Sequence, residues 1–216
     1  MSAAPIAPVA LAEIAEIVER MRGAHPASAR LIVGLAGAPG AGKSTVAAAL
    51  AARLPGAVVL PMDGFHFPQA ELVALGRRER MGAPDTFDVD AFVALLEHLR
   101  SVAGSGTTVL APGFDRRVEE PVPGAIKLLP ERRTVIVEGN YLLLRKGRWQ
   151  RVAPLLDLSV GVVLDEATRH DRLIARHIAF GKTPDAARAW ALGPDERNAA
   201  AIAATLEHAD HFLAAQ

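Results

Sequence analysis

The chain has 216 residues, of which 50% are hydrophobic; this is enough to bury one sizeable core, and we expect a single domain over residues 1–216. Basic and acidic residues each number 24, so the formal net charge is zero at pH 7, which excludes the global positive field typical of a nucleic-acid-binding protein. The absence of cysteine excludes disulfides, thiolate nucleophiles and cysteine-ligated zinc, and it fits a cytoplasmic protein.

Near the N-terminus, residues 8–22 predict an amphipathic helix rather than a signal peptide, because the segment lacks a basic start and is interrupted by glutamates. Its apolar positions recur at helical spacing: Leu11, Ile14, Val18 and Met21. Along the chain, no stretch reaches the roughly 18 uncharged apolar residues that a membrane span requires. We therefore expect no membrane partner.

Short apolar runs alternate with longer alanine- and leucine-rich segments over the rest of the chain, which predicts an α/β fold. The runs that predict strands buried on both faces are 31–36, 57–61, 107–111, 134–139 and 158–164. The segments that predict helices are 43–53, those starting at Asp88 and Glu166, and one from about Pro194 into the C-terminus. We expect a central, mostly parallel five-stranded sheet flanked by helices. Residues 64–87 and 112–131, rich in Gly, Pro and charge, are expected to form irregular functional loops.

The first predicted strand runs into a phosphate-binding motif, because Gly37 is followed after four residues by Gly42, Lys43 and Ser44, and a helix follows. Glycines let backbone N–H groups turn onto phosphate oxygens, while Lys43 supplies a positive charge and the Ser44 hydroxyl can coordinate Mg²⁺. The predicted nucleotide-binding residues are Gly37, Ala38, Pro39, Gly40, Ala41, Gly42, Lys43, Ser44 and Thr45. A glycine-rich turn that only connects strand to helix is the alternative.

Two carboxylates follow predicted strands: Asp63 after the second and Glu138 at the end of the fourth. Open parallel sheets bind ligands outside the carboxyl ends of their strands, so both should lie near the phosphate-binding loop. We assign Asp63 as the base that takes a proton from an attacking hydroxyl, and Glu138 as a magnesium-binding residue together with Ser44. A turn-forming role before Gly64 is the alternative for Asp63. Neither asparagine is followed by Lys-x-Asp, which argues against a regulatory GTPase.

Taken together, the motifs resemble the P-loop small-molecule kinases related to uridine kinase, phosphoribulokinase and type I pantothenate kinase. The motifs that carry this resemblance are GAPGAGKST, MDGFHF, GAPDTFDVDAF, PGFDRR and VIVEGNYLLL, and they span nearly the whole chain. It is most similar to a compact bacterial branch called nucleoside/nucleotide kinase-like or fructose-transport-system kinase. The resemblance implies a three-layer P-loop NTPase fold, ATP and Mg²⁺ as cofactors, a catalytic base at Asp63 and lid arginines on the helix after Glu166.

Residues in the predicted loops 64–87 and 112–131 are expected to hold the phosphate acceptor, since they combine aromatic walls with polar groups. The candidate substrate residues are Asp63, His66, Asp85, Phe87, Phe114 and Arg116. His66 is equally open to a packing role between its aromatic neighbours. Asp88 is interpreted as the cap of the helix that follows it.

A third segment, residues 166–190, is expected to form a lid. Arg169, Arg172 and Arg176 fall on one face of its helix, and Arg172 and Arg176 are the candidates for stabilising charge on the transferred phosphoryl group. The alternative is a solvated basic face. No His/Asp cluster has the spacing of a dedicated metal site, so Mg²⁺ is expected to arrive with the nucleotide.

Two functions remain open at this point. The first is an ATP-dependent kinase that phosphorylates a hydroxyl of a small metabolite such as a sugar, a nucleoside or a pantothenate-like alcohol. The second is a regulatory switch in which ATP binding orders loops that dock a partner. A switch has no use for a base facing an acceptor, so Asp63 discriminates between them. The sequence leaves the choice between monomer and homodimer open.

Overall fold

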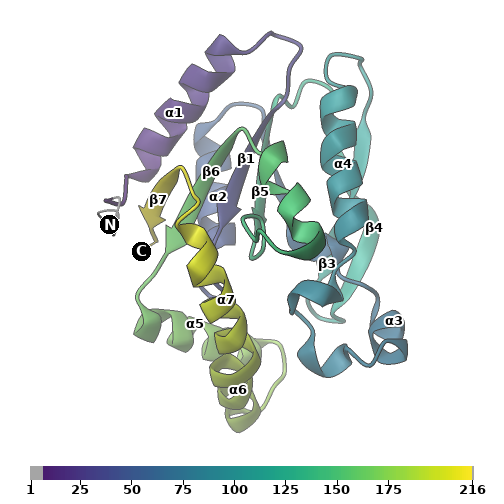
Figure 1. Cartoon of the computed structure of the whole chain (residues 1–216), viewed down its shortest axis with the longest axis vertical. Helices are drawn as coiled ribbons and strands as arrows, with labels where there is room; N and C mark the ends of the chain where they lie inside the picture. The colour runs from purple at the N-terminus through teal and green to yellow at the C-terminus, as the bar shows by residue number, and fades with distance from the viewer. Residues whose placement is uncertain (1–6, 216) are drawn as a thin grey trace.

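The computed structural model describes residues 7–215 and shows an α/β fold built on a five-stranded sheet (Figure 1). The strand order is β2-β5-β1-β6-β7, and every neighbouring pair is parallel. The five strands are β1 (Leu31–Ala36), β2 (Ala57–Pro61), β5 (Thr134–Gly139), β6 (Leu158–Val163) and β7 (His211–Ala214). The predicted mostly parallel five-stranded sheet is confirmed, although β7 takes the place of the predicted strand 107–111.

Helices alternate with these strands as expected for crossover connections between parallel strands. Within residues 7–215 they are α1 (Leu11–Ala24), α2 (Lys43–Arg53), α3 (Gln69–Ala74), α4 (Val89–Ser101), α5 (Glu166–Ala179), α6 (Pro184–Trp190) and α7 (Glu196–Leu206). A π-helical turn, Ala191–Asp195, joins α6 to α7. In this part of the chain, no helix combines the length and the hydropathy needed to span a bilayer.

The sheet separates two apolar layers, because alternate residues of its central strand point to opposite faces. Leu31, Val33 and Leu35 pack with α1 and α2, whereas Ile32 packs on the side of α4 and α7. All six residues of β1 are buried, and so are all six of β5. This arrangement is the predicted three-layer fold, with the most buried strands at its centre.

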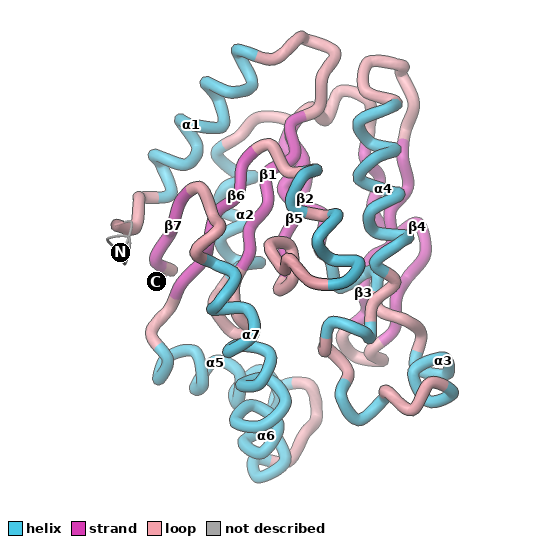
Figure 2. Tube along the Cα trace, viewed as in Figure 1, coloured by secondary structure: helices cyan, strands magenta, loops and turns pink. Residues whose placement is uncertain are grey.

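The predicted strand 107–111 does not join the five-stranded sheet. It begins at Val109 and continues to Asp115 as β3, which pairs antiparallel with β4 (Glu120–Leu128) in a separate hairpin behind α4 (Figure 2). Leu110 is 57% exposed, so this strand is covered on one face only, and the continuous apolar run was misleading. The prediction that 112–131 is an irregular loop is also wrong, because most of this segment forms the two strands of the hairpin.

Two further expectations need correction. The C-terminal helix ends at Leu206, and the chain then adds β7 to the edge of the sheet next to β6. The 64–87 segment is not uniformly irregular, since it contains α3 and short 3₁₀ turns at Arg78–Arg80 and Pro84–Thr86.

The predicted cap of α4 is confirmed, because the Asp88 side chain accepts a hydrogen bond from the Ala91 N–H at 2.9 Å.

Gly64 fixes the position of the turn that follows β2. A Cβ atom on Gly64 would lie 2.3 Å from the carbonyl oxygen of Pro112 in the β3–β4 hairpin, whereas a Cβ on Gly23 in α1 would meet nothing within 4 Å. The backbone of the turn therefore lies directly against the backbone of the hairpin at Gly64, with no room for a side chain there.

We predict that Gly64→Ala lowers the free energy of unfolding by about 1–3 kcal/mol, because the hairpin backbone must move to admit a methyl group. Gly23→Ala is the matched control, and it should be neutral or stabilising by up to about 1 kcal/mol through helix propensity. Urea unfolding curves measure both. Equal stabilities of the two variants would contradict this view of the contact.

Candidate active site

The glycine-rich segment forms a loop between β1 and α2 whose shape requires glycine. Gly40 and Gly42 have φ angles of 81° and 88°, in the left-handed region that other residues rarely adopt, and Gly42 is the N-cap of α2. Lys43 is buried, and its ammonium group donates to the Ala38 carbonyl at 3.0 Å. The loop therefore presents a helix N-terminus and a cation together, which is the arrangement that binds phosphate.

Burial lowers the pKa of Lys43 to about 8, although the Glu138 and Asp63 carboxylates act in the opposite direction. A lysine that is this strongly desolvated gains much from a neighbouring anion, because the anion restores the favourable environment that water gave its charged form. Lys43 is thus prepared to interact with a phosphate group.

Glu138 stands at the sheet edge where the loop begins. Its backbone lies opposite Leu35 of β1 and Pro61 of β2 in the parallel register, and its Oε1 accepts a hydrogen bond from the Ser44 hydroxyl at 2.9 Å. Burial and the nearby Asp63 charge raise the pKa of Glu138, against the effects of Lys43 and Ser44. A carboxylate and a hydroxyl this close together fit the all-oxygen ligand set that Mg²⁺ prefers.

Asp63 lies on the 3₁₀ turn Met62–Phe65 directly after β2, and its Oδ2 accepts a hydrogen bond from Arg116 of the hairpin turn at 2.7 Å. Burial alone would raise the pKa of Asp63, but Arg116, together with Lys43 and Arg176, holds this pKa below its usual value. The side chain is therefore an ionised carboxylate near neutral pH, able to accept a proton from a bound hydroxyl.

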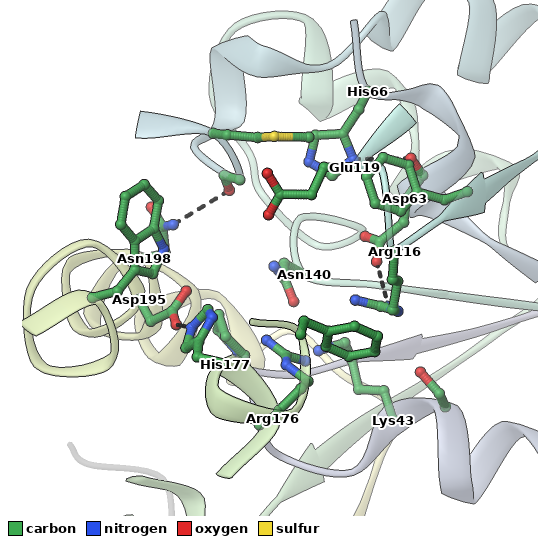
Figure 3. A pocket seen from close by; sticks show the side chains of 18 of the residues that line it. Lys43, Asp63, His66, Arg116, Glu119, Asn140, Arg176, His177, Asp195 and Asn198 are labelled. Atoms are coloured by element: carbon green, nitrogen blue, oxygen red, sulfur yellow. Dashed lines mark hydrogen bonds and ion pairs between the residues drawn. The ribbon is translucent and has the colours of Figure 1, made fainter. Parts of the chain in front are cut away.

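A cavity of about 600 Å³ connects these groups (Figure 3). It is large enough for a nucleotide end and a small acceptor. The predicted site residues that line it are Pro39, Gly40, Gly42, Lys43, Ser44, Thr45, Asp63, His66, Phe87, Phe114, Arg116, Glu138, Arg172 and Arg176. Gly37, Ala38 and Ala41 shape the loop without lining the cavity.

Asp85 is the predicted substrate residue that the structure keeps apart from the others. Its carboxylate is exposed and forms ion pairs with Arg80 and Arg77, and it does not line the cavity. The 3₁₀ turn Pro84–Thr86 sends Phe87 inward, where it is 3% exposed, and leaves Asp85 on the surface. The sequence Asp-Thr-Phe therefore encodes a turn rather than a pair of substrate contacts. Asp85 is no longer a candidate substrate residue, because it does not line the cavity.

The arginines of α5 divide into two groups. Arg172 and Arg176 line the cavity, and burial together with Arg116 lowers the pKa of Arg176. Arg169 is 6% exposed and pairs instead with Glu196 at the start of α7, so it connects two helices. The predicted stripe of three arginines therefore contributes two cations to the cavity.

Several polar residues that line the cavity were not identified from the sequence. They are Arg78, Glu119, Asn140, His177, Lys182, Asp195 and Asn198. Asp195 accepts a hydrogen bond from His177 Nε2 at 2.7 Å, and Asn198 donates to the Gly82 carbonyl at 3.3 Å. Asp195 and Asn198 occupy positions i and i+3 in an alanine-rich segment, and this spacing on one helix face was the signal that could have revealed them.

One carboxylate–histidine cluster lies outside the cavity. Glu166, His170 and Glu196 place a ligand atom each within 4.8 Å of one another, which the sequence spacing did not predict. Glu196 already accepts hydrogen bonds from both Arg169 and His170. The cluster therefore serves to hold α5 against α7.

Comparison with known proteins places these features in one family. The Phosphoribulokinase / Uridine kinase family matches residues 32–210. A protein named "Putative uridine kinase C227.14" from Schizosaccharomyces pombe is 36% identical over 162 residues, covering 70% of this chain and 68% of that one. "Uncharacterized protein YggC" of Escherichia coli is 38% identical over 175 residues, with 78% and 71% covered.

Among solved structures, a "putative fructose transport system kinase from Silicibacter sp. TM1040" superimposes with a TM-score of 0.83 and 38% identity. The superposition covers 94% of this chain and 98% of that one. The similarity therefore extends over nearly the whole chain rather than over the central sheet alone.

We predict that Lys43→Ala weakens binding of a nucleoside triphosphate by about 10- to 100-fold, because one charge-assisted contact is lost from the phosphate groups. Titration calorimetry with ATP and Mg²⁺ measures the change. Lys146→Ala removes an exposed lysine outside the cavity and is the matched control. Parent-like affinity of Lys43→Ala would show that the 37–45 loop does not cradle phosphate.

Proposed function

The chain belongs to the Phosphoribulokinase / Uridine kinase family and is an ATP-dependent phosphotransferase, and we propose that it transfers the γ-phosphate of ATP to a hydroxyl of a small metabolite. The observation that carries the proposal is an ionised Asp63 beside the phosphate-binding loop, facing a cavity with space for an acceptor. A switch protein needs the loop and Glu138 but has no use for this carboxylate.

Phosphoryl transfer requires the acceptor oxygen to lose a proton as it attacks phosphorus. The hydroxyl oxygen forms the new P–O bond, the bond between the γ-phosphorus and the β–γ bridging oxygen breaks, and ADP leaves with that electron pair. Asp63 accepts the hydroxyl proton. Its bond to Arg116 orients the carboxylate, so that one oxygen remains available to the acceptor.

The phosphate groups require positive charge on the side of the cavity near α2. Lys43 and the α2 N-terminus supply it on one side, and Arg172 and Arg176 of α5 supply it on the other. Ser44 and Glu138 are the residues that would hold Mg²⁺, which when bound neutralises charge on the β- and γ-phosphates. The lining residues of the 64–87 segment and of the β3–β4 hairpin are assigned to the acceptor in this proposal.

The acceptor is a sugar such as fructose, a nucleoside or a pantothenate-like alcohol in this proposal. The names of two similar proteins, a uridine kinase and a fructose transport system kinase, support the first two classes. The experiment is an assay of ADP release with ATP, Mg²⁺ and a broad metabolite panel. Release that depends on one acceptor supports the kinase, whereas binding of ATP without acceptor-dependent release supports the regulatory switch.

We predict that Asp63→Asn lowers acceptor phosphorylation by about 10²- to 10⁴-fold, because the amide cannot accept the hydroxyl proton, while affinity for Mg·ATP changes by about tenfold or less. Glu138→Gln is the contrasting variant. Loss of its charge should weaken magnesium-dependent nucleotide binding as well as turnover.

Steady-state kinetics and a magnesium titration distinguish the two variants, and a melting curve confirms that each is folded. If folded Asp63→Asn retained near-parent phosphorylation, Asp63 would be only the turn residue before Gly64. The proton acceptor would then be sought among the other carboxylates that line the cavity.

A further inference from the structure

His66 offers an unused hydrogen-bond acceptor to the cavity. Its Nδ1 lies 2.9 Å from the carbonyl oxygen of Asp63, and because a carbonyl can only accept, Nδ1 must carry the proton. The ring is 8% exposed and packs between Phe87 and Phe114, with centroid distances of 3.8 and 5.0 Å. Burial lowers the pKa of His66, which favours the neutral ring.

In a neutral ring with the proton on Nδ1, the other nitrogen carries a lone pair. Within residues 7–215, no hydrogen bond to the Nε2 atom of His66 is seen, and this atom is not among the buried side-chain atoms that lack a partner. Because His66 lines the cavity, Nε2 is open to it and can accept a hydrogen bond from a ligand. The atom that fits is the hydrogen of a donor, such as a hydroxyl.

Glu119 adds a second acceptor to the same wall. Figure 3 shows its carboxylate pointing into the cavity next to His66. Glu119 has a φ of 53° and is the one non-glycine residue with positive φ in the described chain. Backbone strain of this kind concentrates at functional sites, because the surrounding structure must impose it. Here the turn brings a partly exposed carboxylate to the wall of the cavity, where it pairs with Arg78.

The cations on this wall are already engaged. Arg116 pairs with Asp63 at 2.7 Å, and Arg78 pairs with Glu119 at 2.6 Å. A carboxylate or phosphate on the acceptor would have to break one of these ion pairs or lie against Glu119. Either arrangement is unfavourable, since like charges repel and a broken pair gives up a hydrogen-bonded contact between two partly exposed side chains.

From these contacts we infer that the phosphate acceptor is an uncharged polyol, whose hydroxyls donate to His66 Nε2 and to the Glu119 carboxylate, rather than a molecule bearing a carboxylate or phosphate. His66 and Glu119 are thereby specificity-determining residues. The inference rests on the proposed kinase function, and it narrows the acceptor to sugars, sugar alcohols and nucleosides.

The other cationic side chains that line the cavity are Lys43, Arg172, Arg176 and Lys182, and the proposed function assigns the first three to the phosphate groups. Figure 3 shows Arg176 on the wall opposite His66, where the proposed function assigns it to the transferred phosphoryl group. Lys182 sits with its ammonium group 4.6 Å from the centroid of the Trp190 ring. Lys182 is the residue that would anchor an anionic acceptor if the inference were wrong, so it enters the test as a variant.

The experiment compares matched pairs of acceptors that differ in one charged group: glycerol with glycerate, panthenol with pantothenate, and fructose with fructose 6-phosphate. ADP release gives kcat/KM for each. We expect the uncharged member of the pair that is turned over to be preferred by about 100-fold or more, because the charged member would lie against the Glu119 carboxylate or break an ion pair. Preference for an anionic member, lost in Lys182→Ala, would overturn the inference and leave the kinase function intact.

Absence of acceptor-dependent ADP release from every pair would overturn the proposed function, and the inference with it. The two failures are thus distinguishable, because the first still shows phosphorylation.

Variants test whether Glu119 and His66 cause the preference for the uncharged acceptor. Glu119→Gln removes the negative charge and frees Arg78, so the preference for the uncharged acceptor should fall by about tenfold or more, mainly through KM. Glu79→Gln changes an exposed glutamate outside the cavity and should leave the ratio unchanged. An unchanged ratio in folded Glu119→Gln would contradict the role of Glu119.

His66→Phe keeps an aromatic ring between Phe87 and Phe114 but has no nitrogen, and it should raise KM for the uncharged acceptor about tenfold. His66→Gln restores an acceptor oxygen near the position of Nε2, so it should recover part of that loss. A melting curve for each variant separates packing from recognition. Equal KM values for His66→Phe and the parent would remove His66 from the acceptor site.

Discussion

The parallel register of β2, β5 and β1 is the constraint on which the candidate site depends. Because the strands run in the same direction, their carboxyl ends meet at one edge, and Glu138 of β5 lies opposite Leu35 of β1 and Pro61 of β2. The phosphate-binding loop leaves β1 one residue beyond that register, and Asp63 follows two residues after β2. The hydrogen bond from Ser44 to Glu138, which joins residues 94 positions apart, is a direct result. Without this alignment, the side chains of these motifs would lie too far apart to contact the same ligand.

The same edge places two carboxylates in one desolvated space, and the environment gives them different properties. Burial and the charge of Asp63 raise the pKa of Glu138, whereas Arg116 and its neighbouring cations hold the pKa of Asp63 down. A pair of acids whose pKa values are separated in this way takes on different roles. Asp63 stays ionised without a metal and suits proton transfer. Glu138 gains most from a nearby cation, which fits a residue that binds Mg²⁺ near the phosphate groups.

Local patterns predicted well where the glycine-rich loop and the strand-end carboxylates lie, and they predicted poorly which residues form the opposite wall of the cavity. The loop 37–45, the two strand-end carboxylates and the Asp88 cap are each encoded within a few residues, so spacing and side-chain chemistry were enough. The acceptor wall is formed by pairs far apart in sequence: Arg116 with Asp63, and Glu119 with Arg78. A local sequence pattern does not predict which charged side chains pair between the hairpin and the 62–87 region. The apolar run 107–111 had moreover been assigned to the main sheet rather than to a hairpin. Asp85 shows the converse, because a promising sequence context led to an exposed ion pair.

The division of the proposed site into a phosphate side and an acceptor side also explains how one fold can keep the same reaction while its acceptor specificity changes. The phosphate side is built on buried strands that cannot shift without disturbing the core. The proposed acceptor side is built on the β3–β4 hairpin, the 64–87 segment and the α6–α7 region. The carbonyl of Gly82 in the 64–87 segment accepts hydrogen bonds from Tyr141, which follows β5, at 2.6 Å and from Asn198 of α7 at 3.3 Å. Substitutions at Glu119 or Asn198 therefore alter side chains around the acceptor without moving Lys43 or Glu138. Specificity can change there at little cost to stability, since these positions lie outside the two apolar layers.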